Sequence, residues 1–183
     1  HWDDSRRPDR GKVLNATEIE GLSRFQRYLD VDGDGIPYRT LPGVSPKAAF
    51  FTRGSGHAKS GAYTEDAHEY QEVVDRLSRK FDTAKTLVPT AVATPAQDGA
   101  NHEIGILSLG TCDGAVKEAL AALAAEGLHA DYLRVRGFPF GEDVERWLEQ
   151  HRTVFVVEQN RDAQLRSLLT LETRVPKDKL RSI

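Results

Sequence analysis

EIGILSL at residues 103–109, ADYLRVR at residues 130–136 and TVFVVE at residues 153–158 are the three apolar runs that decide the fold of this chain. Each run is short and lies between turn residues, as buried strands do. Residues 112–127 and 142–151, which separate the runs, have apolar side chains at helical spacing. This alternation predicts an α/β fold, a three-layer sandwich in which helices cover a mostly parallel sheet.

The same pattern continues toward the end of the chain. We expect Thr111 or Asp113 to cap the helix at residues 112–127, and Asp162 to cap a last helix that contains Leu165 and Leu169. Residues 179–183 (KLRSI) have the composition of a strand that is just beginning.

A long helix precedes the sheet. Residues 64–87 place apolar side chains on one stripe, and Thr64 is the expected N-cap. Residues 88–101 (VPTAVATPAQDGAN) have the composition of a linker. Before the long helix, only residues 17–29 have helical spacing, with Thr17 as the expected cap. The sequence therefore predicts an irregular tail at residues 1–63, a helix and linker at 64–101, and an α/β domain at 102–183.

Composition excludes several classes of function. The 183 residues have a net charge of -3, which provides no general attraction for nucleic acid or an anionic membrane. No apolar run approaches the roughly 20 residues that a membrane span needs, and the charged N-terminus is not a secretory signal. The single cysteine, Cys112, excludes an internal disulfide and a thiolate metal cluster. The absence of methionine predicts a fragment of a longer chain.

The most obvious motif is DVDGDGI at residues 30–36. Asp30, Asp32 and Asp34 alternate as the first ligands of a calcium loop do, and a glycine occupies the sixth position. The twelfth position should be a bidentate Glu, and here it is Leu41. A solvated acidic turn is therefore the favoured interpretation, with a bound cation as the alternative.

A second candidate is the glycine-rich stretch RGSGH at residues 53–57. Arg53 and His57, next to free backbone amides, have the chemistry to receive a phosphate or carboxylate. A flexible surface turn is the simpler interpretation, because the Gly-Lys-Ser/Thr ending of a P-loop is absent.

A third candidate is the turn at residues 110–114, which begins with Gly110 and ends with Gly114. It follows a predicted parallel strand, where open α/β sheets bind ligands, but it lacks the spacing of a dinucleotide fingerprint. Cys112 in this turn has no His or Asn partner at a recognisable spacing, so we expect a small buried residue there. No complete catalytic constellation is visible, and we assign no catalytic residue.

Six successive blocks of the sequence resemble one enzyme family. RTLPG (39–43), FFTRGSGH (50–57), YTEDAHEY (63–70), LSRKF (77–81), YLRVRGFPF (132–140) and VVEQNRDAQLRSLL (156–169) are similar, in order, to the alpha subunit of 2-oxoacid:ferredoxin oxidoreductases of the 2-oxoglutarate type. The block ending in VEQNRD is the most specific of them.

The resemblance implies a fold and a function. It implies the C-terminal part of the alpha subunit, including a domain similar to the transketolase C-terminal domain. Such enzymes use thiamine diphosphate, Mg²⁺, a [4Fe-4S] cluster and coenzyme A to convert a 2-oxoacid to an acyl-CoA, here succinyl-CoA, and pass electrons to ferredoxin. The implied partners are the beta subunit and the rest of the alpha subunit, and the implied location is the cytoplasm.

The departures from the family pattern define the expected role. The Tyr-Pro-Ile-Thr-Pro-type substrate segment is absent, and most cofactor ligands belong to the beta subunit, so the resemblance implies a structural and assembly role without activity of its own. Two alternatives remain open. One is a stand-alone module that binds a nucleotide or coenzyme A at residues 110–114, and the other is calcium binding at Asp30, Asp32 and Asp34.

Overall fold

The computed structural model describes residues 3–96, 99 and 103–183. The chain forms two compact units, His1–Thr83 (unit 1) and Ala84–Ile183 (unit 2). The division of the sequence into a tail, a helix with its linker and an α/β domain stays a prediction.

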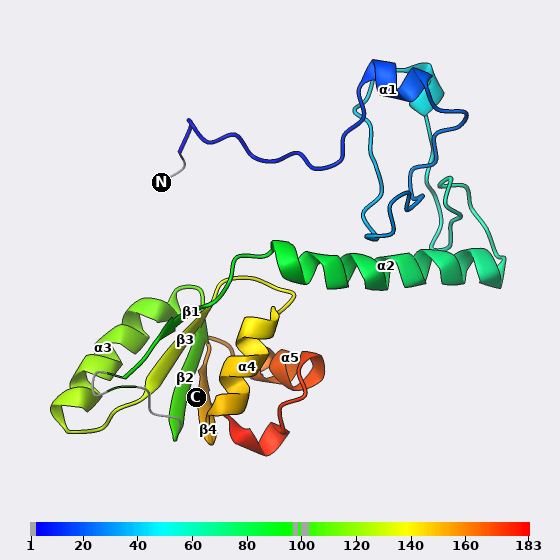
Figure 1. The fold of residues 1–183 in the computed structure, drawn as a ribbon. Coiled ribbons are helices and arrows are strands. Elements are labelled where there is room, and N and C mark those ends of the chain that lie inside the picture. Colours follow the sequence, from blue (N-terminus) through cyan, green and yellow to red (C-terminus); the bar gives the residue numbers. More distant parts are fainter. Residues whose placement is uncertain (1–2, 97–98, 100–102) are drawn as a thin grey trace. The chain divides into compact units, whose positions relative to one another are not determined.

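Unit 2 contains a five-stranded sheet with the strand order β1-β3-β2-β4-β5 (Figure 1). β3, β2, β4 and β5 run parallel to one another, and β1 pairs with β3 in the antiparallel direction. The α/β class with a mostly parallel sheet is thus confirmed. The strands are β1 (Val92–Thr94), β2 (Ile104–Leu109), β3 (Asp131–Val135), β4 (Thr153–Val157) and β5 (Leu180–Ser182).

β1 was not expected, because it lies within the proline-containing stretch at residues 88–101 that the sequence presents as a linker. Three residues between prolines are too short for a periodic signal, and only the pairing with β3 makes them a strand. Part of that predicted linker, residues 97–98 and 100–101, lies outside the described residues.

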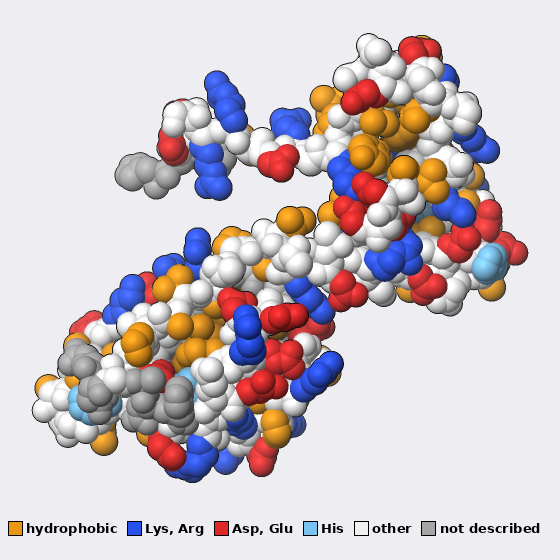
Figure 2. All heavy atoms as spheres, viewed as in Figure 1, with side chains coloured by type: hydrophobic (Ala, Val, Ile, Leu, Met, Phe, Trp, Pro, Cys, Tyr) orange, Lys and Arg blue, Asp and Glu red, His pale blue; other side chains and the backbone are white. Residues whose placement is uncertain are grey.

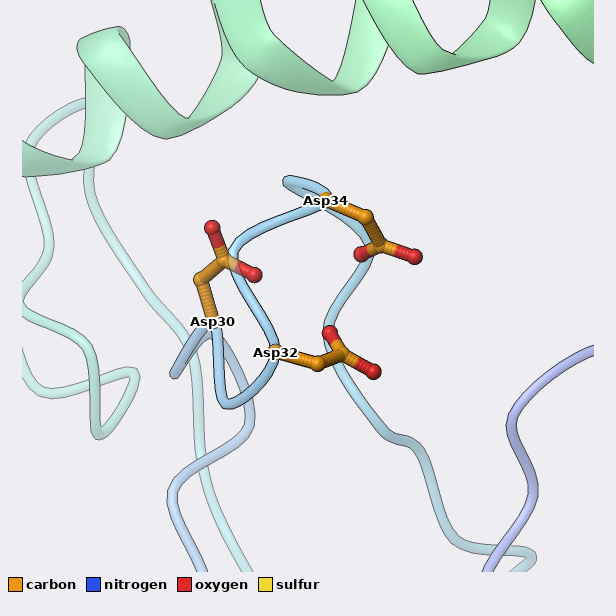
Figure 3. Close-up of side chains that lie close together, drawn as sticks. All are labelled: Asp30, Asp32 and Asp34. Carbon is orange, nitrogen blue, oxygen red and sulfur yellow. The ribbon is translucent and has the colours of Figure 1, made fainter.

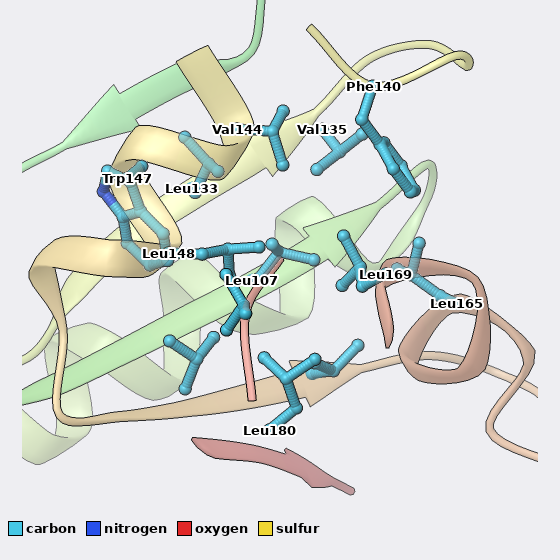
Figure 4. Close-up of a cluster of buried hydrophobic side chains, with 13 residues drawn as sticks. Leu107, Leu133, Val135, Phe140, Val144, Trp147, Leu148, Leu165, Leu169 and Leu180 are labelled. Carbon is cyan, nitrogen blue, oxygen red and sulfur yellow. The ribbon is translucent and has the colours of Figure 1, made fainter. Parts of the chain in front are cut away.

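Helices cover both faces of the sheet. α3 (Cys112–Ala125) lies on one face, and α4 (Glu142–Gln150) and α5 (Gln164–Glu172) lie on the other (Figure 1). The larger core lies under α4 and α5, and Figure 4 shows its side chains converging between these helices and the strands. A smaller cluster of Ile106, Val116 and Tyr132 lies under α3. Because helices cover both faces of the sheet, side chains on both sides of each strand can be apolar, which explains the apolar runs in the sequence.

A buried ion pair joins three segments at the amino ends of the strands. His151 Nε2 lies 3.0 Å from Asp131 Oδ2, and the two side chains are 0% and 5% exposed. His151 Nδ1 donates to the Trp147 carbonyl at 2.8 Å, and Asp131 Oδ1 accepts from the Ala96 amide. Gly105 in β2 makes room for this group, because a Cβ there would lie 2.5 Å from the Trp147 ring. These hydrogen bonds join the segments that contain Ala96, Asp131 and His151, so we assign the pair a structural role.

Unit 1 is mostly irregular, with α1 (Ala16–Glu20), a short 3-10 helix (Pro46–Ala48) and α2 (Ala67–Leu87), whose last residues belong to unit 2. The predicted helix at residues 17–29 is wrong. Asn15, not Thr17, caps α1 through a reciprocal capping box with Glu18, and the helix ends at Glu20 with Gly21 as its C-cap. A similar correction applies to α2, since the Asp66 carboxylate, not the Thr64 hydroxyl, accepts the Glu69 amide in its first turn. Among the described residues, no helix has the length and apolar character to cross a membrane.

Candidate functional site

The carboxyl edge of the sheet is the place where the fold would position a ligand. β2 leads into α3 on one face, and β4 leads into α5 on the opposite face, so the connections diverge between these two neighbouring strands. Such a divergence forms the crevice that open α/β sheets use for binding. The two loops at this point touch, because the Thr111 hydroxyl donates to Gln159 Oε1 at 3.4 Å.

The first loop is dominated by Asp113. Its Oδ2 lies 2.9 Å from Lys117 Nζ and 3.5 Å from Arg134 Nη1, and its Oδ1 accepts the Tyr132 hydroxyl at 3.0 Å. The hydrogen bond from Lys117 is the largest cause that lowers the pKa of Asp113, and the Tyr132 hydroxyl and Arg134 add to it. Burial raises the pKa of Tyr132, whose hydroxyl also lies 2.6 Å from Ser108 Oγ. The network holds the start of α3 onto β2 and β3.

Neither side chain that we expected as a cap hydrogen-bonds as one. Thr111 occupies the N-cap position of α3, but its side chain makes no cap hydrogen bond. Cys112 is buried, as expected, with 5% of its surface exposed. The helix is therefore anchored by Asp113 and by packing, not by an N-terminal hydroxyl.

The second loop contains the VEQNRD sequence, and its polar residues cap α5. Glu158 Oε2 accepts the Leu165 amide at 2.7 Å, and Oε1 accepts the Arg166 amide at 3.1 Å. Asn160 Oδ1 accepts the Gln164 amide at 3.1 Å. The prediction that Asp162 caps this helix is wrong. Ala163 occupies the N-cap position with a φ of 51°, in the left-handed region. The side chains that accept the first amides of the helix belong to Glu158 and Asn160, which precede this turn in the sequence.

These contacts decide what the crevice can accept. Asp113 lies in the first turn of α3, and Glu158 is bound to the first turn of α5, so each helix N-terminus already has a carboxylate. A helix N-terminus attracts an anion through its free amides and its dipole, and here protein carboxylates supply that charge. The geometry therefore disfavours a phosphate-bearing ligand at residues 110–114.

The acidic loop of unit 1 brings Asp30, Asp32 and Asp34 together, with one oxygen of each within 4.8 Å of the others (Figure 3). The Lys12 ammonium lies against two of them, 2.7 Å from Asp32 Oδ1 and 2.6 Å from Asp34 Oδ2. It also donates to the Ile36 carbonyl at 3.1 Å. A lysine thus has the oxygen contacts that a loop cation would make, and calcium would have to displace it. Sequence spacing could not reveal Lys12, which is 20 residues away from Asp32.

The same loop is fastened to α2. Arg76 Nη1 donates to the Gly35 carbonyl at 2.9 Å, and the Thr83 hydroxyl donates to the Asp34 carbonyl at 2.6 Å. Gly35 has a φ of +78°, and a Cβ there would lie 2.2 Å from the Lys80 amide nitrogen. Glycine at this position is needed for close packing on the helix, so Gly35 has a structural reason of its own.

Arg53 and His57 each pack on a different aromatic ring. The Arg53 guanidinium lies over the Tyr63 ring, 6.0 Å from its centroid, and the Arg53 side chain is exposed. The His57 ring stacks on Tyr28 with centroids 4.3 Å apart, and its Nδ1 lies 3.2 Å from the Ala58 carbonyl. Both side chains pack on aromatic rings, and their assignment to an anion stays a prediction.

Sequence reasoning missed Arg76, which is 6% exposed. Its guanidinium lies 5.8 Å from the centroid of the Tyr28 ring, and its buried Nε has no hydrogen-bond partner among the residues that the structure describes. Burial lowers the pKa of Arg76, and the charge of Asp30 opposes that shift. In the sequence, Arg76 is one of several cations late in a long helix, so no pattern separated it from a solvated residue.

Comparison with known proteins gives a consistent result. No family model matches the sequence. The alpha subunit of the 2-oxoacid:ferredoxin oxidoreductase of Saccharolobus solfataricus is 24% identical over 172 residues, which are 92% of this chain and 26% of that protein. This chain resembles part of an oxidoreductase alpha subunit. The resemblance drawn from the sequence blocks is thus confirmed, and the chain spans about a quarter of the length of the curated relative.

A solved structure shows the same fold. The 2-oxoglutarate:ferredoxin oxidoreductase from Magnetococcus marinus, with 2-oxoglutarate, coenzyme A and succinyl-CoA bound, matches 90% of this chain and 28% of that oxidoreductase chain, with a TM-score of 0.72 and 24% identity. At this identity the likeness supports the fold alone. Both comparisons cover nearly the whole chain but only a fraction of the oxidoreductase polypeptide, so the activity of the oxidoreductase is a matter for a proposal.

Proposed function

We propose that this chain is part of the alpha subunit of a thiamine-diphosphate-dependent 2-oxoacid:ferredoxin oxidoreductase that acts on 2-oxoglutarate in the cytoplasm. The enzyme would form succinyl-CoA and reduce ferredoxin. The observation that carries the proposal is the similarity to an oxidoreductase alpha subunit along 92% of the chain. The solved oxidoreductase with 2-oxoglutarate bound supports the choice of substrate.

Within that enzyme the chain acts as a scaffold, because its residues do not fit the cofactors. An iron–sulfur cluster needs several thiolates, and the only cysteine, Cys112, is buried. A magnesium ion for a diphosphate needs open oxygen ligands, and Lys12 already lies against Asp32 and Asp34. The ligands for these groups are therefore proposed to lie in the beta subunit and in the rest of the alpha subunit.

Arg53 and His57 remain the proposed anion contacts of the chain. The exposed Arg53 side chain is followed by Gly54, which is also exposed and has a φ of +81°. A charge-assisted hydrogen bond from Arg53 to a carboxylate or phosphate would contribute roughly 1–3 kcal/mol. A stand-alone module that binds a nucleotide or coenzyme A at residues 110–114 is less well supported, because Asp113 places a negative charge in the first turn of α3 and Glu158 accepts amides of α5.

The test is an activity assay on two samples. The purified 183-residue chain should give no 2-oxoglutarate-dependent and CoA-dependent reduction of ferredoxin. The assembly that co-purifies with the tagged chain from its source cell should give that activity, and should contain thiamine diphosphate and an iron–sulfur cluster.

Each sample can contradict a different part of the proposal. Turnover by the chain alone would refute the scaffold role, and an assembly without oxidoreductase activity would refute the function. Replacing 2-oxoglutarate by pyruvate in the second sample tests the substrate, because a higher rate with pyruvate would contradict the 2-oxoglutarate assignment.

A further inference from the structure

Arg76 is the only buried lysine or arginine among the described residues, and 6% of its surface is exposed. It belongs to α2, and its Nη1 donates to the Gly35 carbonyl, which is a neutral acceptor. In the part of the chain that the structure describes, no carboxylate forms an ion pair with it. A guanidinium is always protonated in a protein, and a buried charge without a counter-ion is costly. Arg76 therefore lacks the partner that its burial requires.

One edge of the Arg76 guanidinium is unused. Nε–H and one N–H of Nη2 point in the same direction, and together they form the edge that binds a carboxylate through two parallel hydrogen bonds. Nε is buried, and neither Nε nor Nη2 has a hydrogen-bond acceptor among the described residues. The unused donors match the two oxygens of one carboxylate group.

Arg76 also lines a pocket of about 230 Å³ within unit 1. α2 forms one wall of the pocket, and the segments that contain Tyr28 and Lys59 form the others. The centroid of the Tyr28 ring lies 5.8 Å from the guanidinium carbon, and Leu29 and Val73 add aliphatic side chains. A water molecule occupies about 30 Å³ in the liquid, so the pocket has room for an acid of a few carbon atoms.

The other charged side chains of the pocket are paired or screened. Lys59 Nζ lies 2.8 Å from Glu72 Oε2, and Arg79 Nη2 lies 3.3 Å from Asp30 Oδ2. Asp75 is exposed, so water and salt screen its charge. Among the described residues, Arg76 thus supplies the buried charge of the pocket that still needs a counter-ion.

The surface charges of unit 1 indicate a small ligand. Figure 2 shows acidic and basic side chains interspersed on the visible face of unit 1, whereas nucleic acid and anionic lipid need an extended cationic surface. The charge of a single carboxylate balances that of Arg76. The second charge of a phosphate dianion would instead face the pocket carboxylates of Asp30, Glu72 and Asp75.

We propose that Arg76 binds the carboxylate of a small monocarboxylic acid through Nε and Nη2, in the pocket between α2 and the segments at Tyr28 and Lys59. The carboxylate becomes the counter-ion of the buried guanidinium. Because Nη1 donates to Gly35, the same side chain links the ligand to the loop at residues 30–36. The site lies within unit 1 and is independent of the proposed enzyme activity.

An acetate titration of the purified chain tests this pairing at the atom that makes it. Arginine Nε–H groups give separate signals in proton–nitrogen NMR spectra, and Arg76→Lys identifies the Arg76 signal by removing it. That signal should move along a saturating curve at millimolar acetate, and the signal of Arg24, which is exposed outside the pocket, should not. Sodium chloride at the same ionic strength should have no effect, and phosphate should bind more weakly than acetate. The absence of a saturable shift, an equal effect of chloride, or tighter binding of phosphate would overturn the inference.

Variants test the pocket itself. Lys59→Glu adds a negative charge to the wall and leaves Arg76 in place, so half-saturation of the Arg76 signal should need at least roughly threefold more acetate. Lys47→Glu, at an exposed position outside the pocket, is the matched control and should leave that concentration unchanged. Arg76→Lys keeps the charge but lacks the planar edge, and should weaken acetate binding roughly tenfold, as followed at the Gly35 amide. Unchanged affinity in Lys59→Glu or in Arg76→Lys would refute the site.

A side chain of another polypeptide is the second possible source of a carboxylate. A crystal structure of the assembly that co-purifies with the tagged chain, grown in acetate, separates the two sources. Acetate on Nε and Nη2 of Arg76 would support the inference, whereas an Asp or Glu of another polypeptide, or water alone, at this edge would overturn it. Oxidoreductase activity of the assembly is measured separately, and its absence would refute the proposed function without affecting the carboxylate site.

Discussion

Ala163 is the one described residue other than glycine whose φ is positive. Its φ of 51° lets residues 158–162 fold back so that Glu158 and Asn160 reach the amides of α5. A left-handed conformation costs an L-residue roughly 1–2 kcal/mol because Cβ crowds the following carbonyl. Strain of this kind persists only where surrounding contacts impose it, and here the two caps impose it.

The first prediction concerns this strain. Ala163→Gly should stabilise unit 2 by about 0.5–1 kcal/mol, because glycine adopts the left-handed region without strain but has more freedom in the unfolded chain. Chemical denaturation followed by circular dichroism measures the difference. As a control, Ala119→Gly on the exposed side of α3 should destabilise unit 2 by about 0.5–1 kcal/mol. Loss of stability in Ala163→Gly would contradict the left-handed conformation.

Asp113 supports a prediction about pH. Its pKa is lowered from the ordinary value of 3.8, chiefly by the hydrogen bond from Lys117. A carboxylate with a lowered pKa in the folded state stabilises the protein above its ordinary pKa, and this contribution is lost as the pH falls through the lowered value. Asp113→Asn should therefore be less stable than the wild type at neutral pH, and the difference should shrink in acid.

Denaturation curves between pH 2 and pH 7 would measure this convergence. Glu118→Gln, on the same helix at an exposed position, is the matched control and should show no such pH dependence. A constant difference between Asp113→Asn and the wild type across the whole range would show that the carboxylate charge is not what stabilises the start of α3.

At the scale of the elements, α5 depends on a cap from the preceding loop. Glu158 accepts two backbone amides, from Leu165 and Arg166. Four other polar residues of this loop are exposed, namely Gln159, Asn160, Arg161 and Asp162. The block that makes the resemblance most specific thus has a structural role in this chain, since it fixes the helix that covers one face of the sheet.

Glu158→Ala should destabilise unit 2 by about 1–2 kcal/mol, because it leaves two helix amides without their charged acceptor. Glu158→Gln should cost less, since one amide oxygen remains. Thermal unfolding of the purified chain measures both variants. Glu172→Ala, at the exposed end of the same helix, should change stability by less than about 0.5 kcal/mol. Equal effects at Glu158 and Glu172 would refute the capping role.

At the scale of the whole molecule, the two units differ in how they can be stabilised. Unit 2 has a core on each face of its sheet, with the larger one under α4 and α5. Unit 1 contains polar contacts such as the ion pair from Lys12 to Asp32 and the hydrogen bond from Arg76 to the Gly35 carbonyl. Few of its described apolar side chains are buried. Hydrogen bonds and exposed ion pairs contribute little net stability each.

The amino-acid sequence by itself determined the α/β class, the three central strands, the order of the helices between them and the likeness to an oxidoreductase alpha subunit. These features are local, because apolar runs and helical spacing can be read within about 15 residues. The strands of a parallel sheet that is buried on both faces have largely apolar sequences.

The tertiary structure alone decided which polar residues meet. Lys12 reaches Asp32, Glu158 reaches the amides of α5, and His151 reaches Asp131 across 20 residues of sequence. No periodic signal encodes such pairs, since their distance in space depends on how the elements pack. Those contacts fix the acidic loop and the edge at residues 110–114 within the fold, and a cation at Asp30, Asp32 and Asp34 stays a prediction.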